Sequence, residues 1–436
     1  MKEVIRSADP RVAALIDRQA TQAQGRDYLS LDSIRQLLEK LGRPQDRLPP
    51  IFHVAGTNGK GSTCAFLRAA LEAAGKRVHA FTSPHLVRYN ERIRIAGKLI
   101  GDDELERLMS LVLDANEDIG GSLFEVNTAV AFLAFSETPA DACILEVGLG
   151  GRLDSTNIVE QPLVCGIASL GLDHQAFLGD SILEVATEKA GIAKKGVPLV
   201  TQLYPPEVAA RIGAIAHEAE AVWEPRGLHW NAIVRQGKLR YRDSLGELLL
   251  PLPRLPGKHQ ALNAALAVAM LRHQKAIAIP SSAYSAAMEW THWPARMQQL
   301  RGGPLYEMLP RGSELWVDGG HNPSAARLVA DHAKKHWNDG LPLVLVFASL
   351  QAKDAAGNLR PFKGVADEML TLPIEGHECR PPDELAMLAE SMGLAARSRA
   401  SLSGAMTALR KPARVLVFGS LYLAGELLGL NGPLPD

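Results

Sequence analysis

The feature that most constrains this chain is a glycine-rich stretch at residues 56–62, Gly-Thr-Asn-Gly-Lys-Gly-Ser. It follows the apolar run Ile51–Ala55, which predicts a short buried strand, and precedes a helical pattern from Thr63 to Ala74. A strand, a glycine-rich turn, a lysine and a hydroxyl at a helix start are typical of a phosphate-binding loop. The helix N-terminus and Lys60 both add positive charge there. The residues predicted to bind a nucleoside triphosphate are Gly56, Thr57, Asn58, Gly59, Lys60, Gly61 and Ser62.

The loop departs from the standard form of this motif. Only two residues separate Gly56 from Gly59, and Gly61 stands between Lys60 and Ser62. A flexible turn between a strand and a helix is the alternative interpretation of the glycines. The lysine and the hydroxyl at the start of the helix favour phosphate binding over that alternative.

Length and charge limit the classes of protein to which the chain can belong. With 436 residues it exceeds the size of a single core, so two or three domains are expected. The 47 basic and 48 acidic residues give no electrostatic reason to expect nucleic acid or an anionic membrane as a partner. Charges within residues 1–6 predict that there is no signal peptide. The four scattered cysteines favour a reduced, cytoplasmic protein.

Apolar runs alternate with helical patterns along the chain, which is typical of a parallel sheet covered by helices. A polar/apolar hairpin, Ile233–Arg235 with Leu239–Arg242, interrupts this alternation. The strands expected in the first part are Ile51–Ala55, Val78–Thr82, Ala142–Val147, Val164–Ala168 and Val197–Gln202. Those expected in the second part are Leu315–Val317, Leu343–Phe347, Met369–Leu372 and Val415–Phe418. The sequence therefore predicts an α/β protein with a first domain at 1–295, a linker at 296–304 and a second α/β domain at 305–436.

Two further clusters follow predicted strands of the first part. Glu146 ends an apolar run and precedes the glycine-rich stretch 148–151. Ligands of parallel α/β sheets gather at the carboxyl ends of the strands, where a carboxylate can hold Mg²⁺ against phosphates. His174 also follows a strand end, and a neutral imidazole there can serve a second cation. A solvated glutamate and a structural histidine are the alternatives.

Lys189 and the segment 318–323 are two further candidate sites. By its pattern alone, Lys189 in Glu188-Lys189-Ala190-Gly191 is predicted to lie on the surface of a helix. Asp318 follows a predicted strand and Pro323 stands at a predicted helix start, which indicates a ligand-binding corner. A simple turn is the alternative, because Asp, Gly, Asn and Pro all favour turns.

Together these segments resemble the Mur-ligase family of ATP-dependent amide ligases, and within it the folylpolyglutamate synthase branch. The resemblance covers nearly the whole chain in the same order. Thr82–Ile93 and Glu146–Asn157 are specific to the folate branch. The other segments that carry it are Gly56–Ser62, Phe124–Thr128, Leu178–Asp180, Glu188–Ile192, Asp318–Pro323 and Gly419–Tyr422. It implies an N-terminal P-loop mononucleotide-binding domain with a parallel sheet and a smaller C-terminal Rossmann-like α/β domain.

The resemblance also implies roles for individual residues. Lys60 and the surrounding amides would hold the β- and γ-phosphates, and Lys189 would be carbamylated by CO₂. Metal binding, at two Mg²⁺ sites, is implied for Ser83, Glu146 and His174. Contacts to ATP are implied for Asn263, Arg296, Asp318 and His321, with His321 also counted as catalytic. Substrate binding is implied for Pro84, His85, Arg88, Phe124, Thr128 and Asp154.

A few positions depart from the family pattern. Lys258 stands where the family often has Arg, and Ala295 where Gly is common. Ser349–Asp354 is a loosened form of an Asp-Lys-Asp element, which leaves Lys353 and Asp354 without an assigned role. None of these changes touches the phosphate or metal residues.

The reaction implied is the ligation of L-glutamate to dihydropteroate and to reduced folates through an acyl phosphate, with ATP and Mg²⁺. We expect a monomer whose partners are these small molecules. A cell-wall ligase that adds an amino acid to a UDP-sugar peptide is one alternative, disfavoured by Thr82–Ile93. A nucleotide-gated binding module without ligase activity is another, and it would not need the second constellation at Asp318–Pro323. A degenerate homologue is disfavoured because Lys60, Glu146, His174 and Lys189 are all retained.

Overall fold

The fold is that of a computed structural model, which describes residues 9–23, 29–432, 434 and 435. Residues 1–6, where we predicted that there is no signal peptide, lie outside the described residues. The chain divides into two compact units, described separately below. The larger unit runs to Arg254 and includes Lys258–His292, and the smaller unit consists mainly of Trp293–Asp436. Among the described helices, none combines the length and the apolar character needed to cross a membrane.

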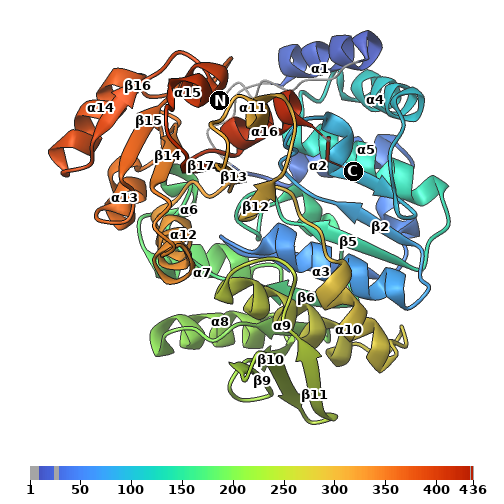
Figure 1. The fold of residues 1–436 in the computed structure, drawn as a ribbon. Helices are drawn as coiled ribbons and strands as arrows, with labels where there is room; N and C mark the ends of the chain where they lie inside the picture. The colour runs from blue at the N-terminus through green and yellow to red at the C-terminus, as the bar shows by residue number, and fades with distance from the viewer. Residues whose placement is uncertain (1–8, 24–28, 433, 436) are drawn as a thin grey trace. The chain divides into compact units, whose positions relative to one another are not determined.

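The larger unit is built on an eight-stranded sheet with the strand order β4-β3-β2-β5-β1-β6-β7-β8 (Figure 1). Six neighbouring strands, β2, β5, β1, β6, β7 and β8, are parallel to one another. Strands β3 and β4 add an antiparallel edge beside β2. Its elements are α1 (Pro10–Gln22), α2 (Asp32–Lys40), η1 (Pro44–Arg47), β1 (Ile51–Ala55), α3 (Lys60–Ala73), β2 (Val78–Phe81), η2 (Tyr89–Arg92), β3 (Ile93–Ile95), β4 (Lys98–Leu99), α4 (Asp102–Asn116), α5 (Leu123–Glu137), β5 (Ala142–Glu146), η3 (Ser155–Ile158), β6 (Val164–Ile167), α6 (Gln175–Leu178), α7 (Ile182–Ala190), β7 (Pro198–Thr201), α8 (Pro206–Glu218), β8 (Val222–Pro225), β9 (Trp230–Arg235), β10 (Lys238–Asp243), β11 (Gly246–Pro251), α9 (Lys258–His273) and α10 (Ser281–Trp290).

Both faces of this sheet are covered by helices, which explains why its central strands are apolar along their whole length. Side chains of β1, β5 and β6 on one face pack into cores shared with α4, α5, α7 and α8. On the opposite face, α3 packs against α9 and α10. Gly166 of β6 lies so close to Met270 of α9 that a side chain at this position would collide with the Met270 sulfur. The α/β class and the parallel sheet that we predicted are confirmed.

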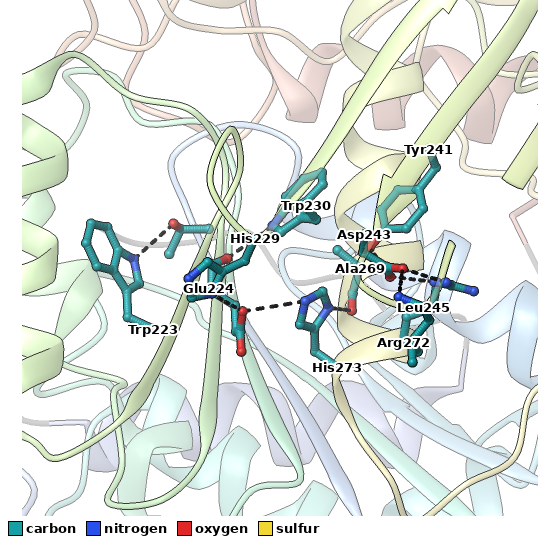
Figure 2. A network of polar contacts seen from close by, with 11 residues as sticks. Trp223, Glu224, His229, Trp230, Tyr241, Asp243, Leu245, Ala269, Arg272 and His273 are labelled. Carbon is teal, nitrogen blue, oxygen red and sulfur yellow. Dashed lines mark hydrogen bonds and ion pairs between the residues drawn. The ribbon is translucent and has the colours of Figure 1, made fainter. Parts of the chain in front are cut away.

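The predicted hairpin is part of a three-stranded antiparallel sheet with the order β11-β10-β9. We had not predicted β11. On the inner face of the three-stranded sheet, Trp230 of β9 and Tyr241 of β10 are buried. Polar contacts join the sheet to α9 (Figure 2). Arg272 of α9 donates two hydrogen bonds of 2.6 Å to the Asp243 carboxylate. Close by, Glu224 pairs with His229, and its carboxylate lies 3.6 Å from His273 Nε2.

The smaller unit has its own six-stranded sheet with the order β12-β13-β17-β14-β15-β16. All its neighbouring strands are parallel except β12, which pairs antiparallel with β13. Its elements are β12 (Gln298–Leu300), α11 (Pro304–Glu307), β13 (Glu314–Val317), α12 (Pro323–His336), β14 (Leu343–Phe347), α13 (Ala355–Leu359), η4 (Arg360–Phe362), β15 (Glu368–Thr371), α14 (Pro382–Ser391), β16 (Ala396–Ser398), α15 (Leu402–Ala408), β17 (Arg414–Phe418) and α16 (Leu421–Asn431).

The segment 296–304, expected to be a linker, contains β12 and the start of α11. Its turn residues are real, since Gly302 and Gly303 both have positive φ angles. Three residues between the turns nevertheless pair with β13, because an edge strand needs only one neighbour for its hydrogen bonds. The domain boundaries at 295 and 305 stay a prediction.

Candidate active site

The predicted phosphate loop connects β1 to α3. Gly59 has a φ of +89°, a backbone conformation that glycine adopts without steric cost, and it precedes the first residue of α3, Lys60. A side chain at Gly59 would collide with Asn263 of α9, so the predicted ATP residue Asn263 lies against the loop. The loop is also fixed to the chain after β6, because Thr57 N–H donates to the Ser169 carbonyl at 2.8 Å.

Glu146 lies at the carboxyl end of β5, the strand next to β1. Its side chain is 4% exposed, and its Oε2 accepts a hydrogen bond of 3.3 Å from the backbone N–H of Ser83. Burial and then the Glu146 carboxylate raise the pKa of the Cys64 thiol on α3, and the cation of Lys60 acts in the opposite direction. Ser83 and Glu146 are therefore in contact, and the charges of Glu146 and Lys60 both act on Cys64, while the phosphate and metal roles of these residues stay predictions.

His174 stands between β6 and α6, and its side chain is 41% exposed. Its Nε2 lies 4.0 Å from Asp173 Oδ1, and Asp173 is almost buried. Within the described ranges, no three His, Cys, Asp or Glu side chains form a cluster that could hold a metal ion. The metal roles of Ser83, Glu146 and His174 stay predictions.

The pattern of its helix predicted that Lys189 lies on the surface, and this prediction is wrong. Lys189 lies in the last turn of α7, is 4% exposed, and its Nζ is 3.4 Å from the carbonyl oxygen of Gly150. Burial and, after it, the cation of Lys60 lower the pKa of Lys189 to about 7, although Asp154, Asp173 and Glu188 act in the opposite direction. Lys189 is buried because the glycine-rich loop at 148–154, which comes from another part of the sequence, covers the end of this helix.

The loop after β2 contains several predicted substrate residues. Glu91 organises it by accepting hydrogen bonds from the backbone N–H groups of Leu86, Val87 and Arg88 at 2.7–3.0 Å. Pro84 is exposed and Arg88 is half-buried. His85 is buried, and its Nδ1 accepts a hydrogen bond of 2.8 Å from Nε of Arg92. Burial and then this guanidinium hold the pKa of His85 well below its usual value, so its ring stays neutral.

The other three predicted substrate residues lie around the loop at 148–154. A side chain at Gly148 would collide with the ring of Phe124, which places Phe124 over the start of this loop. Thr128 shares a hydrogen bond of 2.7 Å with Ser155. Asp154 is buried and accepts hydrogen bonds from the backbone N–H groups of Leu149, at 2.8 Å, and Thr156, at 3.0 Å. Asp154 therefore shapes the loop, and a direct contact with substrate stays a prediction.

In the smaller unit, Asp318, Arg296 and His321 gather at the end of β13. Asp318 is buried and accepts hydrogen bonds from the N–H groups of Met297, at 2.9 Å, and Gly320, at 2.8 Å. Burial raises the pKa of its carboxyl, while the charges of Arg296 and His321 act against this shift. Their roles in ATP binding stay predictions.

Sequence reasoning missed the residues that hold this site together. Arg152 and Glu188, which pair through side chain and backbone, were not singled out although both lie inside quoted motifs. Glycines at 150, 151 and 191 were the signal that two segments approach closely.

A cavity of about 530 Å³ beside the network of Figure 2 is lined by residues 224, 227–231, 242–244 and 273, none of them a predicted site residue.

Comparison with known proteins adds independent information. No protein-family model matches the chain. The dihydrofolate synthase/folylpolyglutamate synthase of Bacillus subtilis is 35% identical over 356 residues, which cover 77% of this chain and 79% of that protein. Escherichia coli FolC in complex with DHPP and ADP has a TM-score of 0.84 at 32% identity, covering 96% of this chain and 97% of that chain. A bifunctional folylpolyglutamate synthase/dihydrofolate synthase with Mn, AMPPNP and L-glutamate bound has a TM-score of 0.84 at 30% identity, covering 98% and 99% of the two chains.

Proposed function

This chain belongs to the family of dihydrofolate synthases and folylpolyglutamate synthases, and we propose that it joins L-glutamate to dihydropteroate and to reduced folates. It is an ATP-dependent ligase of the Mur-ligase type. One observation in the chain itself carries the proposal. Lys189 is buried with its Nζ 3.4 Å from the Gly150 carbonyl oxygen, and burial followed by the cation of Lys60 in the phosphate loop lowers its pKa.

The chemistry explains why such an enzyme needs a phosphate loop. A carboxylate is a poor electrophile, so a carboxylate oxygen of the folate precursor first takes the γ-phosphoryl group of ATP, which gives an acyl phosphate and ADP. The amine nitrogen of glutamate then attacks the acyl carbon, the bond to the phosphate oxygen breaks, and the amine loses a proton. We assign to Lys60 and the N–H groups at the start of α3 the task of neutralising charge on the phosphates during the first step.

The residues at the ends of β5 and β2 fit a divalent cation. Glu146 is a nearly buried carboxylate at the end of β5, and carboxylate oxygens are ligands that Mg²⁺ prefers. Ser83 lies next to it, with its N–H on the carboxylate. We assign Glu146, Ser83 and His174 to Mg²⁺, which neutralises phosphate charge when bound. The Mn-bound homologous structure supports a divalent metal in this fold.

We propose that a carbamate on Lys189 is a further donor to the metal. Carbamylation requires a neutral amine that attacks CO₂, and the lowered pKa of Lys189 makes that form abundant near neutral pH. The product is an anion where an ammonium would repel both Lys60 and a metal ion.

We assign the pterin substrate to the loop that contains Pro84, His85 and Arg88, together with Phe124. His85 is neutral and its Nδ1 is occupied by Arg92, so Nε2 carries the hydrogen and can donate to an acceptor on the substrate. Phe124 offers an aromatic face at the start of the glycine-rich loop. We also propose that the protein is a monomer and lies in the cytoplasm. The four free cysteines fit a reducing compartment.

Product formation tests the function directly. Purified protein with ATP, Mg²⁺ and L-glutamate is given either dihydropteroate or a reduced folate monoglutamate, and the products are separated by chromatography and mass. We expect a glutamate adduct from each substrate and one ADP per adduct. ADP formation that does not depend on glutamate would instead favour the nucleotide-gated module.

A further inference from the structure

We propose that Arg152 and Glu188 are positioning residues that hold the glycine-rich loop against the last turn of α7, so that Lys189 meets the Gly150 carbonyl. The proposal deepens the function given above and rests on it, because it assigns a task to two residues outside the predicted substrate and phosphate residues. It concerns only the larger unit of the chain.

Arg152 and Glu188 are joined twice, although they are 36 residues apart in the sequence. The backbone N–H of Arg152 donates to the Glu188 carbonyl at 2.8 Å. The guanidinium Nε and Nη2 of Arg152 both donate to Glu188 Oε1, at 3.0 and 2.8 Å. A contact through both backbone and side chain fixes the position and the direction of the loop, which a single flexible ion pair does not do.

The glycines around the pair bring the two backbones into close contact. A side chain at Gly151 would come within 2.6 Å of the Glu188 carbonyl oxygen, and one at Gly191 would collide with the Cβ of Arg152. Asn157 is nearly buried and closes the contact, since its Nδ2 donates to the carbonyls of Arg152, at 3.0 Å, and Gly191, at 3.1 Å. The loop and the helix end therefore touch over their backbones, and the paired side chains lie at the rim.

The pair also anchors a largely buried carboxylate. The side chain of Glu188 is 17% exposed, and its Oε2 is buried without a hydrogen-bond partner. Its Oε1 accepts both side-chain hydrogen bonds of Arg152. Loss of Arg152 would remove these two hydrogen bonds and would release the loop whose Gly150 carbonyl meets Lys189.

The experiment compares Arg152→Gln, Arg152→Lys, Glu188→Ala and the double variant Arg152→Gln/Glu188→Ala with wild type. The matched control is Arg107→Gln, which breaks an exposed Arg–Glu pair on the same unit. Three quantities are measured for each protein: kcat and KM for ATP, the melting temperature, and the carbamate signal in ¹³C NMR after incubation with ¹³C-bicarbonate.

We expect Arg152→Gln and Glu188→Ala each to lower kcat about tenfold or more, because small displacements of reacting groups are costly. The carbamate signal should fall in parallel. The double variant should lose no more than the worse single variant, since both act through one contact. Arg152→Lys should recover part of the loss because it retains the charge but not the fork of donors. Arg107→Gln should stay within about twofold of wild type.

Three results would overturn the inference. They are wild-type kcat and carbamate signal in Arg152→Gln, additive losses in the double variant, and losses that follow only a fall in melting temperature and vanish when the assay is cooled. If wild type forms no glutamate adduct, the proposed function fails by itself. The carbamate signals of wild type and Arg152→Gln still decide whether the pair positions Lys189.

Discussion

The side-chain nitrogen of Lys189 lies 3.4 Å from the backbone carbonyl oxygen of Gly150, a residue 39 positions earlier in the chain. The contact joins the last turn of α7 to the glycine-rich loop that follows β5, the strand that ends in Glu146. It buries an amine that would otherwise be solvated, and burial is the main reason for its lowered pKa. The contact therefore joins the proposed carbamylation site, Lys189, to the loop that follows the predicted metal ligand Glu146.

Replacement of this lysine gives the first prediction. Lys189→Ala should be nearly inactive in glutamate ligation, because it removes the group that we expect to be carbamylated. A short-chain carboxylate such as acetate should restore part of the activity by occupying the space of the carbamate. Activity is measured as glutamate incorporation against acetate concentration, with Lys195→Ala as the control lysine.

The outcomes of that experiment are distinct. Full activity of Lys189→Ala without acetate would return Lys189 to a structural role. Inactivity that acetate does not relieve would keep a role for the residue and argue against the carbamate. Acetate should have no effect on wild type at the same concentrations.

Lys60 gives the second prediction. Lys60→Ala should reduce the ligation rate by about 10²-fold or more, because the site loses a cation aimed at the transferred phosphoryl group. The fold should survive, since Lys60 is only partly buried at the first position of α3. Circular dichroism and glutamate incorporation are measured on the same sample. Near-normal turnover of a folded Lys60→Ala protein would contradict the phosphate-loop assignment.

The local elements of the fold could be predicted from the sequence because their signals are local. Strand β1 has the predicted bounds, Ile51–Ala55, since a run of apolar residues in front of a glycine turn suits a strand buried on both faces. Strands β5 and β6 each end one residue before the predicted bound. Where the signal was weaker, in the polar/apolar segment after Trp230, a third strand was missed.

The state of Lys189 could not be predicted from its own helix. α7 has only nine residues, and nothing in its pattern indicates that its last turn is covered. The cover comes from Gly150 and Gly151 on another segment, so it is a tertiary contact. Resemblance to a family supplied what the pattern lacked. The same limit applies to Arg152 and Glu188, whose pairing becomes visible only when the two segments are placed side by side.

Magnesium dependence gives the third prediction. Glu146→Gln and His174→Ala should each raise the Mg²⁺ concentration for half-maximal activity by at least about tenfold, because each removes a proposed ligand. Glu146→Gln keeps the shape of a nearly buried side chain and removes its charge. The activity is titrated with Mg²⁺ at fixed ATP, with Glu220→Gln, an exposed carboxylate, as the control. Unchanged magnesium curves in both variants would remove these residues from the metal site.

The fourth prediction concerns the pH dependence of stability and needs no activity. Burial and Lys60 lower the pKa of Lys189 from 10.5 in the unfolded chain to about 7 in the folded protein. Above pH 10.5 the amine is neutral in both states, so the shift has no effect on the free energy of unfolding. As the pH falls from 10.5 to 7, the unfolded chain takes up a proton that the folded protein does not, and stability is lost. Below pH 7 both states are protonated and the cost is constant.

Lys189→Met removes this titration, so the free energy of unfolding of wild type relative to Lys189→Met should fall as the pH is lowered from 10 to 7, by up to about 1.4 kcal/mol per pH unit. Urea unfolding in buffer free of CO₂ and divalent metals measures it, since carbamylation or metal binding would stabilise wild type alone. Lys195→Met, at an exposed position, should show no such slope. Parallel curves for wild type and Lys189→Met would mean that the amine keeps an ordinary pKa. The neutral amine on which carbamylation depends would then be too scarce at neutral pH to support it.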